Sequence, residues 1–159
     1  MRDDKLLFSL IAKKFKRSFP KKSFISGTSS VPVSGKVFDE KEMINGVEAV
    51  LDGWWTEGRF AESFERKFRD YLGVKYVSLV NSGSSANLVA LSALTSSVFG
   101  ERALKAGDEV ITVATGFPTT VNPIIQNGLI PVFIDNNLGT KNATVQAIQE
   151  AITPKTKAI

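Results

Sequence analysis

The sequence predicts an α/β fold with a parallel-rich sheet and flanking helices, and three observations support this prediction. From residue 74 onward, apolar β-branched runs alternate with segments of helical periodicity. Short turns rich in Gly, Ser or Pro separate them, and strands joined through helices pair in parallel with right-handed crossovers. The 159 residues, 43% of them hydrophobic and 23% charged, are enough for one ordinary domain with a core.

The first part of the chain is expected to be an amphipathic helical arm. Residues 4–17 carry apolar side chains at helical spacing among Lys and Arg residues, which predicts a basic amphipathic helix. Such a helix docks on its own domain or a neighbouring subunit, which is the more common use, or lies on a membrane surface. Residues 18–38 contain Pro and Gly and predict an extended linker. We therefore expect an arm and linker over 1–33 and the fold proper over 34–159.

Two helices are expected next. Asp39 followed by Glu42 matches a capping box, and the helix that it starts continues to about Gly53. The second helix follows Gly58 and stops at Gly73. We expect the aromatic stripe of this second helix to be core and not a ligand-binding site. The stripe consists of Phe60, Phe64, Phe68 and Tyr71 or Leu72.

Strands and helices then alternate to the end of the chain. The last apolar run is unfinished, so we expect the chain to be the truncated N-terminal portion of a longer protein. The expected strands are 74–80, 109–114, 130–135 and the unfinished run 157–159. The expected helices are 86–94, 118–126 with Pro123 inside it, and about 144–152.

Two residue types, Cys and His, are absent from the sequence. Their absence excludes disulfides, Cys/His zinc sites, Cys nucleophiles and His-based triads from this stretch of chain. Any chemistry here must use carboxylates, hydroxyls, amines or a bound cofactor. No apolar run approaches the roughly 18 residues that span a bilayer, and the short apolar stretch at 6–12 is followed by Lys residues without a small-residue cleavage site, so we expect no cleavable leader. We expect a cytoplasmic protein without a membrane span.

The basic charge of the chain is confined to its arm. Residues 1–22 carry a net charge of +6 and residues 23–159 a net charge of −2, within a total of +4. A nucleic-acid-binding protein would interleave basic and aromatic residues along one face of its fold. We therefore expect no nucleic-acid partner.

The turn at residues 81–85 is a candidate phosphate site. It joins a predicted strand to the first turn of a helix, where free N–H groups and the positive end of the helix dipole face outward. Gly83 lets the backbone approach an anion closely, and the hydroxyls of Ser84 and Ser85 add donors. The alternative is that Ser82 or Ser84 merely caps the helix.

Two further residues follow neighbouring strands. Phe117 lies on the loop after the strand at 109–114, where an aromatic ring suits stacking on a flat cofactor. The alternative is a packing ring at a helix start. Asp135 follows the strand at 130–135 and is either a carboxylate in the same crevice or a turn cap.

Several motifs follow one another in a characteristic order. Ser-Gly-Ser-Ser-Ala-Asn at 82–87 is followed by Gly-Phe-Pro-Thr-Thr-Val-Asn-Pro at 116–123 and Ile-Gln-Asn-Gly at 125–128. From about residue 34 to its end, the chain resembles the DegT-type family of PLP-dependent sugar aminotransferases. Within this family it is most similar to the nucleotide-sugar 3-dehydrase branch, of the CDP-4-keto-6-deoxyglucose type, in lipopolysaccharide and dideoxysugar biosynthesis. The other matching segments are 53–60, 64–65, 71–74, 107–111 and 131–135.

The resemblance implies the N-terminal part of a fold-type I PLP-transferase large domain. It implies that Gly83, Ser84 and Ser85 hold the phosphate of pyridoxal phosphate (PLP) or pyridoxamine phosphate (PMP), and that Phe117 stacks on the pyridine ring. It also implies a nucleotide-linked 4-keto-6-deoxy sugar as substrate and a homodimer.

In the dehydrase branch, PMP reacts with the 4-keto group, a His base removes a proton and the hydroxyl at carbon 3 leaves. An iron–sulfur cluster with Cys ligands and a partner reductase supply electrons. Because the chain contains neither His nor Cys, we expect these groups after residue 159. The fragment then has no catalytic residue and no metal ligand, and is inactive alone.

Two alternatives remain open. A true sugar aminotransferase of the same family carries Lys where the dehydrase carries His. A non-catalytic α/β module would hold some other phosphate at the Gly83 turn.

Overall fold

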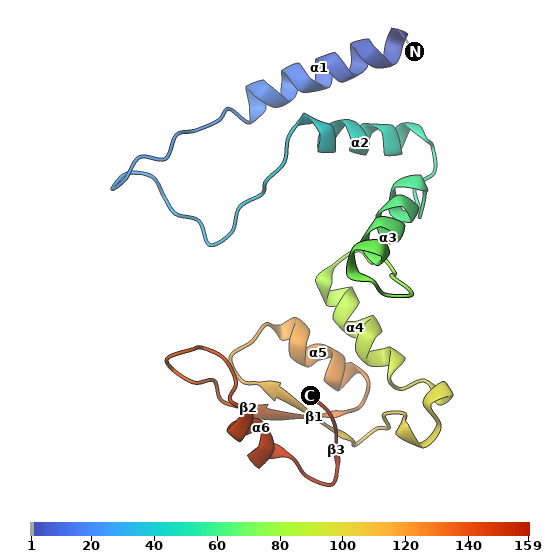
Figure 1. The fold of residues 1–159 in the computed structure, drawn as a ribbon, viewed down its shortest axis with the longest axis vertical. Coiled ribbons are helices and arrows are strands. Elements are labelled where there is room, and N and C mark those ends of the chain that lie inside the picture. Colours follow the sequence, from blue (N-terminus) through green and yellow to red (C-terminus); the bar gives the residue numbers. More distant parts are fainter. Residues whose placement is uncertain (1) are drawn as a thin grey trace. The chain divides into compact units, whose positions relative to one another are not determined.

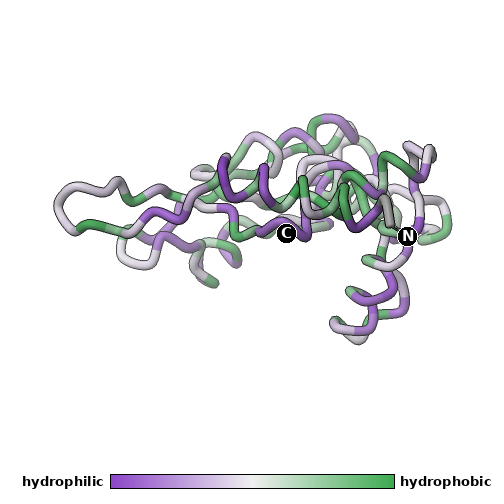
Figure 2. Tube along the Cα trace, turned by 90° about the horizontal axis from the view of Figure 1, so that it is seen from above, coloured by the Kyte–Doolittle hydropathy of each residue, from purple (hydrophilic) through white to green (hydrophobic). Residues whose placement is uncertain are grey.

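The structure, a computed structural model, describes residues 2–159. The described chain forms two compact units, one up to Ser78 and one from Leu79. Helices and parallel strands follow one another as the α/β prediction requires (Figure 1). Hydrophobic and hydrophilic residues alternate over short distances along the trace (Figure 2). The arm boundary expected at residue 33 stays a prediction.

The first unit contains three helices whose ends follow the sequence signals. The carboxylate of Asp39 accepts a hydrogen bond from the Lys41 amide (2.7 Å), and that of Glu42 accepts one from the Asp39 amide (2.6 Å), which confirms the capping box. Gly73 ends the third helix in the left-handed region at φ 66°, as expected of a glycine stop. The helices are α1 (Arg2–Ser18), α2 (Glu40–Leu51) and α3 (Arg59–Leu72).

The amphipathic helix of the arm is confirmed, and it docks on α2 of its own unit. Leu7, Phe8 and Ile11 are half-buried. At its end, the ring of Phe15 lies 5.3 Å from that of Phe38, which precedes α2, in an edge-on arrangement. Aromatic contacts of this kind are favourable, so they help to hold α1 on α2.

The prediction that the aromatic stripe of α3 is core is wrong for the described residues. Phe64 is 47% exposed and Phe68 40% exposed, while their rings lie 5.4 Å apart along the helix. Helical spacing identifies an apolar face, but a face is buried only when another element covers it. Within the described part of this unit, no helix buries that face.

The strand expected at 74–80 is also not formed. This run is apolar and β-branched, yet its backbone is irregular, and the sheet of the described residues does not include it. A strand requires a neighbouring strand with which to exchange backbone hydrogen bonds, and side-chain composition does not provide one.

The second unit contains a three-stranded parallel sheet, which confirms the predicted parallel pairing. Its order is β2-β1-β3, and β1 and β2 are in register from Glu109 opposite Ile130 to Val113 opposite Ile134. Helix α4 packs against α5, which in turn packs against β1 and β2 (Figure 1). The strands are β1 (Glu109–Val113), β2 (Ile130–Ile134) and β3 (Thr156–Ala158); the helices are α4 (Gly83–Ala93), α5 (Pro118–Gln126), α6 (Val145–Ala151) and the 3-10 helix η1 (Ser97–Arg102).

The core of the second unit lies between its central strand and its helices. Val110 of β1 and Ile124 of α5 are buried together with Leu104 and Leu129, and Leu91 of α4 packs against them. This core fixes α4 and α5 relative to β1, the strand that precedes the Phe117 loop. Of the helices that the structure describes, none has the length and apolar character needed to cross a membrane.

Candidate cofactor site

The turn before α4 leaves two backbone donors free. The Ser82 hydroxyl accepts a hydrogen bond from the Ser85 amide (3.2 Å), and the Ser82 carbonyl accepts one from the Ala86 amide (3.0 Å), so Ser82 caps the helix as one alternative proposed. Capping does not exclude anion binding. Within the described chain, the amides of Gly83 and Ser84 make no hydrogen bond, as is usual for the first amides of a helix.

The side chains of this turn divide into engaged and available groups. The Ser85 hydroxyl donates to Asn81 Oδ1 (2.6 Å), so its proton points into the turn. The exposed Ser84 hydroxyl has no hydrogen-bond partner in the part of the chain that the structure describes. A Cβ placed on Gly83 would meet no atom within 4 Å, which leaves the space beside its amide open.

Phe117 lies at the start of α5. It is the N-cap residue, and its carbonyl accepts a hydrogen bond from the Thr120 amide (2.9 Å). The ring is 78% exposed, so it is presented on the loop and not packed into the core of its unit. A Cβ on the preceding Gly116 would lie 3.3 Å from Val113 Cγ2, which is a tight contact that favours glycine there.

The two candidate loops lie at the N-terminal ends of neighbouring helices. Ser84 and Ser85 line a small hollow between α4 and α5 together with Thr119. Asn87 of α4 donates from Nδ2 to the Thr119 carbonyl (3.2 Å), two residues after Phe117. Sequence reasoning did not single out Asn87 as a functional residue. The available signal was a polar side chain within the apolar pattern of α4.

Asp135 lies apart from this hollow. It lines a separate open hollow with Thr115 and Lys141. The turn after β2 is capped by Asn137, whose Oδ1 accepts from the amides of Gly139 (2.9 Å) and Thr140 (3.0 Å). Among the described residues, Asp135 neither makes this cap nor lines the hollow at the Ser84 turn.

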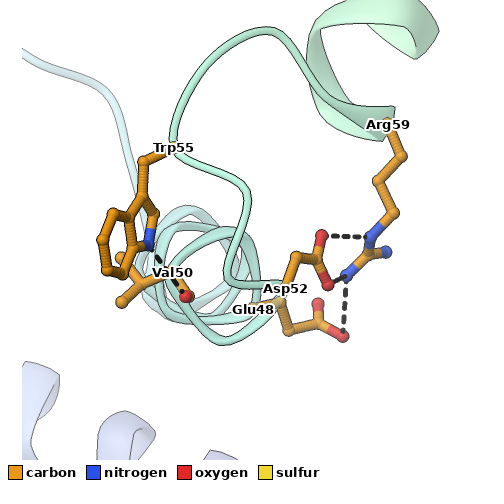
Figure 3. A network of polar contacts seen from close by, with 5 residues as sticks. All are labelled: Glu48, Val50, Asp52, Trp55 and Arg59. Carbon is orange, nitrogen blue, oxygen red and sulfur yellow. Dashed lines mark hydrogen bonds and ion pairs between the residues drawn. The ribbon is translucent and has the colours of Figure 1, made fainter.

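Two residues of the motif at 53–60, Trp55 and Arg59, form polar contacts with the C-terminal part of α2 and with Asp52, which follows it (Figure 3). Arg59 donates to both carboxylate oxygens of Asp52 (2.7 and 3.2 Å), and its Nη2 lies 3.8 Å from Glu48 Oε1. The hydrogen bond to Asp52 raises the pKa of Arg59; the Asp52 and Glu48 charges act in the same direction, against desolvation. Trp55 Nε1 donates to the Val50 carbonyl (3.3 Å). Arg59 is thus engaged in closing the connection from α2 to α3.

Most of the chain matches a known protein family. Residues 38–159 match the model of the DegT/DnrJ/EryC1/StrS aminotransferase family. The chain belongs to this family. The DegT match includes both candidate loops, the sheet of the second unit and helices α2 and α3.

Individual relatives are similar to this chain over most of its length. The lipopolysaccharide biosynthesis protein RfbH of Salmonella typhimurium is 57% identical over 94% of this chain and 34% of its own length. The dTDP-4-dehydro-2,6-dideoxy-D-glucose 3-dehydratase of Saccharopolyspora spinosa is 47% identical over 98% of this chain and 33% of its own. The chain thus spans about a third of the length of these curated relatives.

Solved structures are similar in fold as well. The E. coli GDP-4-keto-6-deoxy-D-mannose-3-dehydratase with bound hydrated PLP superimposes with a TM-score of 0.68 at 34% identity, covering 80% of this chain and 32% of that one. The sugar aminotransferase Spr1654 of Streptococcus pneumoniae, in its PLP form, has a TM-score of 0.69 at 26% identity, covering 80% of this chain and 31% of that one. The predicted relation to fold-type I PLP-dependent enzymes is therefore confirmed.

Proposed function

We propose that this chain is the cofactor-holding, N-terminal part of a PMP-dependent nucleotide-sugar 3-dehydratase. One observation carries the proposal. The free amides of Gly83 and Ser84 and the exposed ring of Phe117 lie at the N-terminal ends of two helices that contact each other. A phosphate and a flat ring joined in one molecule would use both features.

The residues fit such a cofactor in their chemistry. Two helix N-terminal amides and the Ser84 hydroxyl are donors, which suits a phosphate dianion near the positive end of a helix dipole. The open space beside Gly83 admits a phosphate oxygen. The exposed Phe117 face offers apolar area to a pyridine ring.

In this proposal the chain binds and orients, and does not transfer protons. Gly83 and Ser84 hold the phosphate, and Phe117 fixes the plane of the ring. Ser85, which we expected to bind the phosphate as well, shapes the turn through its bonds to Ser82 and Asn81. When bound, PMP supplies the amine and the electron-accepting ring needed to expel the hydroxyl at carbon 3 of the sugar. The base that moves the proton lies in a longer protein, so we expect the chain by itself to show no turnover.

The substrate in this proposal is a CDP-linked 4-keto-6-deoxyhexose. The motifs at 82–87 and 116–123 support the 3-dehydratase branch, as do relatives described as dTDP- and GDP-sugar 3-dehydratases. An iron–sulfur cluster, a partner reductase and a homodimer complete the proposal and rest on the resemblance alone. A cytoplasmic location is proposed from the N-terminal residues, where charged residues flank a short apolar stretch. A sugar aminotransferase is the second candidate, supported by the similarity to Spr1654.

The proposal is tested first by ligand binding to the chain. PMP is titrated by absorbance, and inorganic phosphate serves as the competitor. We expect PMP to bind more tightly than phosphate, because the ring adds a contact that phosphate lacks. Equal affinity for the two ligands would favour the non-catalytic phosphate-binding module.

A second experiment uses the longer protein, with an electron donor in place of the proposed reductase, and CDP-, dTDP- and GDP-linked 4-keto-6-deoxyhexoses. Mass spectrometry distinguishes a sugar that has lost the oxygen at carbon 3 from one in which an amine replaces the carbonyl oxygen. Replacement of the carbon-3 hydroxyl by hydrogen in the CDP-sugar is expected. Gain of an amine would identify an aminotransferase, and preference for another nucleotide would correct the substrate.

A further inference from the structure

We propose that Asn87 is a positioning residue that sets the separation between the phosphate turn and the stacking ring. This inference rests on the proposed function. The side chain of Asn87 links α4 to α5 across 32 positions in the sequence, through its hydrogen bond to the Thr119 carbonyl (3.2 Å). Both ends of this bond lie close to a proposed cofactor contact.

The position of Asn87 on α4 places it beside the phosphate donors. It follows Gly83 by four residues and Ser84 by three, so it lies on the same side of the helix one turn later. Thr119 lies in the first turn of α5, directly after Phe117 and Pro118. A shift of α5 along α4 would therefore change the distance from the ring to the amides.

The sequence of α5 explains why the Thr119 carbonyl is available. In a regular helix this carbonyl accepts a hydrogen bond from the amide of residue 123. Residue 123 is a proline inside α5, and proline has no N–H group. Pro123 thus leaves the Thr119 carbonyl without its helical donor, and the side-chain Nδ2 of Asn87 donates to this carbonyl instead.

The hydrogen bond adds direction to an otherwise apolar contact. Leu88 of α4 and Pro123 of α5 line the same hollow. Leu91 of α4 packs against the core that contains Ile124 of α5. Apolar packing is non-directional and permits small shifts, whereas an amide–carbonyl bond weakens steeply with poor geometry. Asn87 and Pro123 therefore act as a matched pair that fixes one register of α5 on α4.

The test compares ligands that use one loop or both. In the full chain, Asn87→Leu is expected to weaken PMP binding about threefold to tenfold, the scale of one net hydrogen bond. Binding of inorganic phosphate, which uses only the α4 turn, should change less than about twofold. Asn87→Gln keeps an amide donor and should recover part of the PMP affinity. Hydrogen exchange of the Thr120 amide should become faster in Asn87→Leu without any ligand.

The matched control is Asn127→Leu. Asn127 also donates from Nδ2 to a carbonyl of α5, that of Pro123 (2.8 Å), but at the far end of the helix from Phe117. This variant should destabilise the unit while leaving the ratio of PMP to phosphate affinity unchanged. A double-mutant cycle with Pro123→Ala sharpens the test, because an alanine at this position restores the helical donor and should reduce the effect of Asn87→Leu.

The outcomes separate the inference from the function on which it rests. If the wild-type chain binds PMP no more tightly than phosphate, both the proposed function and this inference are contradicted. Wild-type chain that binds PMP while Asn87→Leu keeps full PMP affinity, or loses PMP and phosphate affinity in parallel, would overturn the positioning role alone.

Discussion

In the unit up to Ser78, helices α2 and α3 bury no residue, whereas the unit from Leu79 has a core around Val110 and Ile124. Apart from the docking of α1 on α2, the first unit relies on local interactions, such as the capping box at Asp39 and the Arg59 network. The second relies on contacts between residues far apart in the sequence. The comparison shows that local caps suffice for well-formed helices, whereas the packing of helices on a sheet requires a core of residues far apart in the sequence.

The largest expected effect is on the core of the second unit. Ile124 is 2% exposed, so Ile124→Ala should lower the free energy of unfolding by about 2–5 kcal/mol. Hydrogen exchange of the β1 amides measures this loss. Phe64→Ala is the comparison in the first unit, where the ring is 47% exposed, and should have a smaller effect. Equal losses at both sites would contradict the contrast between the units.

The second prediction tests whether a change at Ser84 weakens ligand binding without disturbing the fold of the second unit. Ser84→Asp places a carboxylate against the phosphate and should weaken PMP binding at least tenfold, roughly 1.4 kcal/mol. The same carboxylate in the first turn of α4 is favourable toward the helix dipole, so the fold should be preserved. Isothermal titration and circular dichroism measure the two quantities. Unchanged PMP affinity in a folded variant would remove Ser84 from the site.

Phe117→Ala tests whether the exposed ring serves the ligand. Loss of a stacked ring should weaken PMP binding about tenfold. Because Phe117 is 78% exposed, the melting temperature should stay close to that of the wild type. Thermal melting with and without PMP measures both. A variant that melts like Ile124→Ala but retains PMP affinity would show a packing role instead.

The smallest expected effect concerns the first unit. Asp52→Asn removes the carboxylate that accepts two hydrogen bonds from Arg59. Exposed ion pairs contribute little and are screened by salt. We expect a slight fall in helix content by circular dichroism that disappears at high salt. A large loss that persists in high salt would show that the network does more than close a surface connection.

Much of the fold followed from short-range patterns. The caps at Asp39 and Gly73 depend on atoms a few residues away, so their sequence signals suffice. The strands of the second unit were predicted to within a residue or two, since apolar runs between turns are distinctive there. The exposed position of Phe117 followed from its place on a loop after a strand.

The errors have a common cause. The run at 74–80 has the composition of a strand, and Phe64 and Phe68 have the spacing of a buried face. Both patterns describe what a segment is suited to, and neither identifies the element that would pair with it or cover it. Within the described residues, no strand pairs with residues 74–80 and no element buries Phe64 and Phe68.

By itself, the sequence determined the caps of the helices, the limits of the three strands that form the sheet, which turns carry glycine and serine, and which family the motifs resemble. Only the tertiary structure decided which faces are buried and that the side chain of Asn87 meets the carbonyl that Pro123 leaves free. The reason is physical. Caps and turns are satisfied by atoms within one turn of the chain, whereas burial and cross-helix hydrogen bonds depend on how distant segments pack.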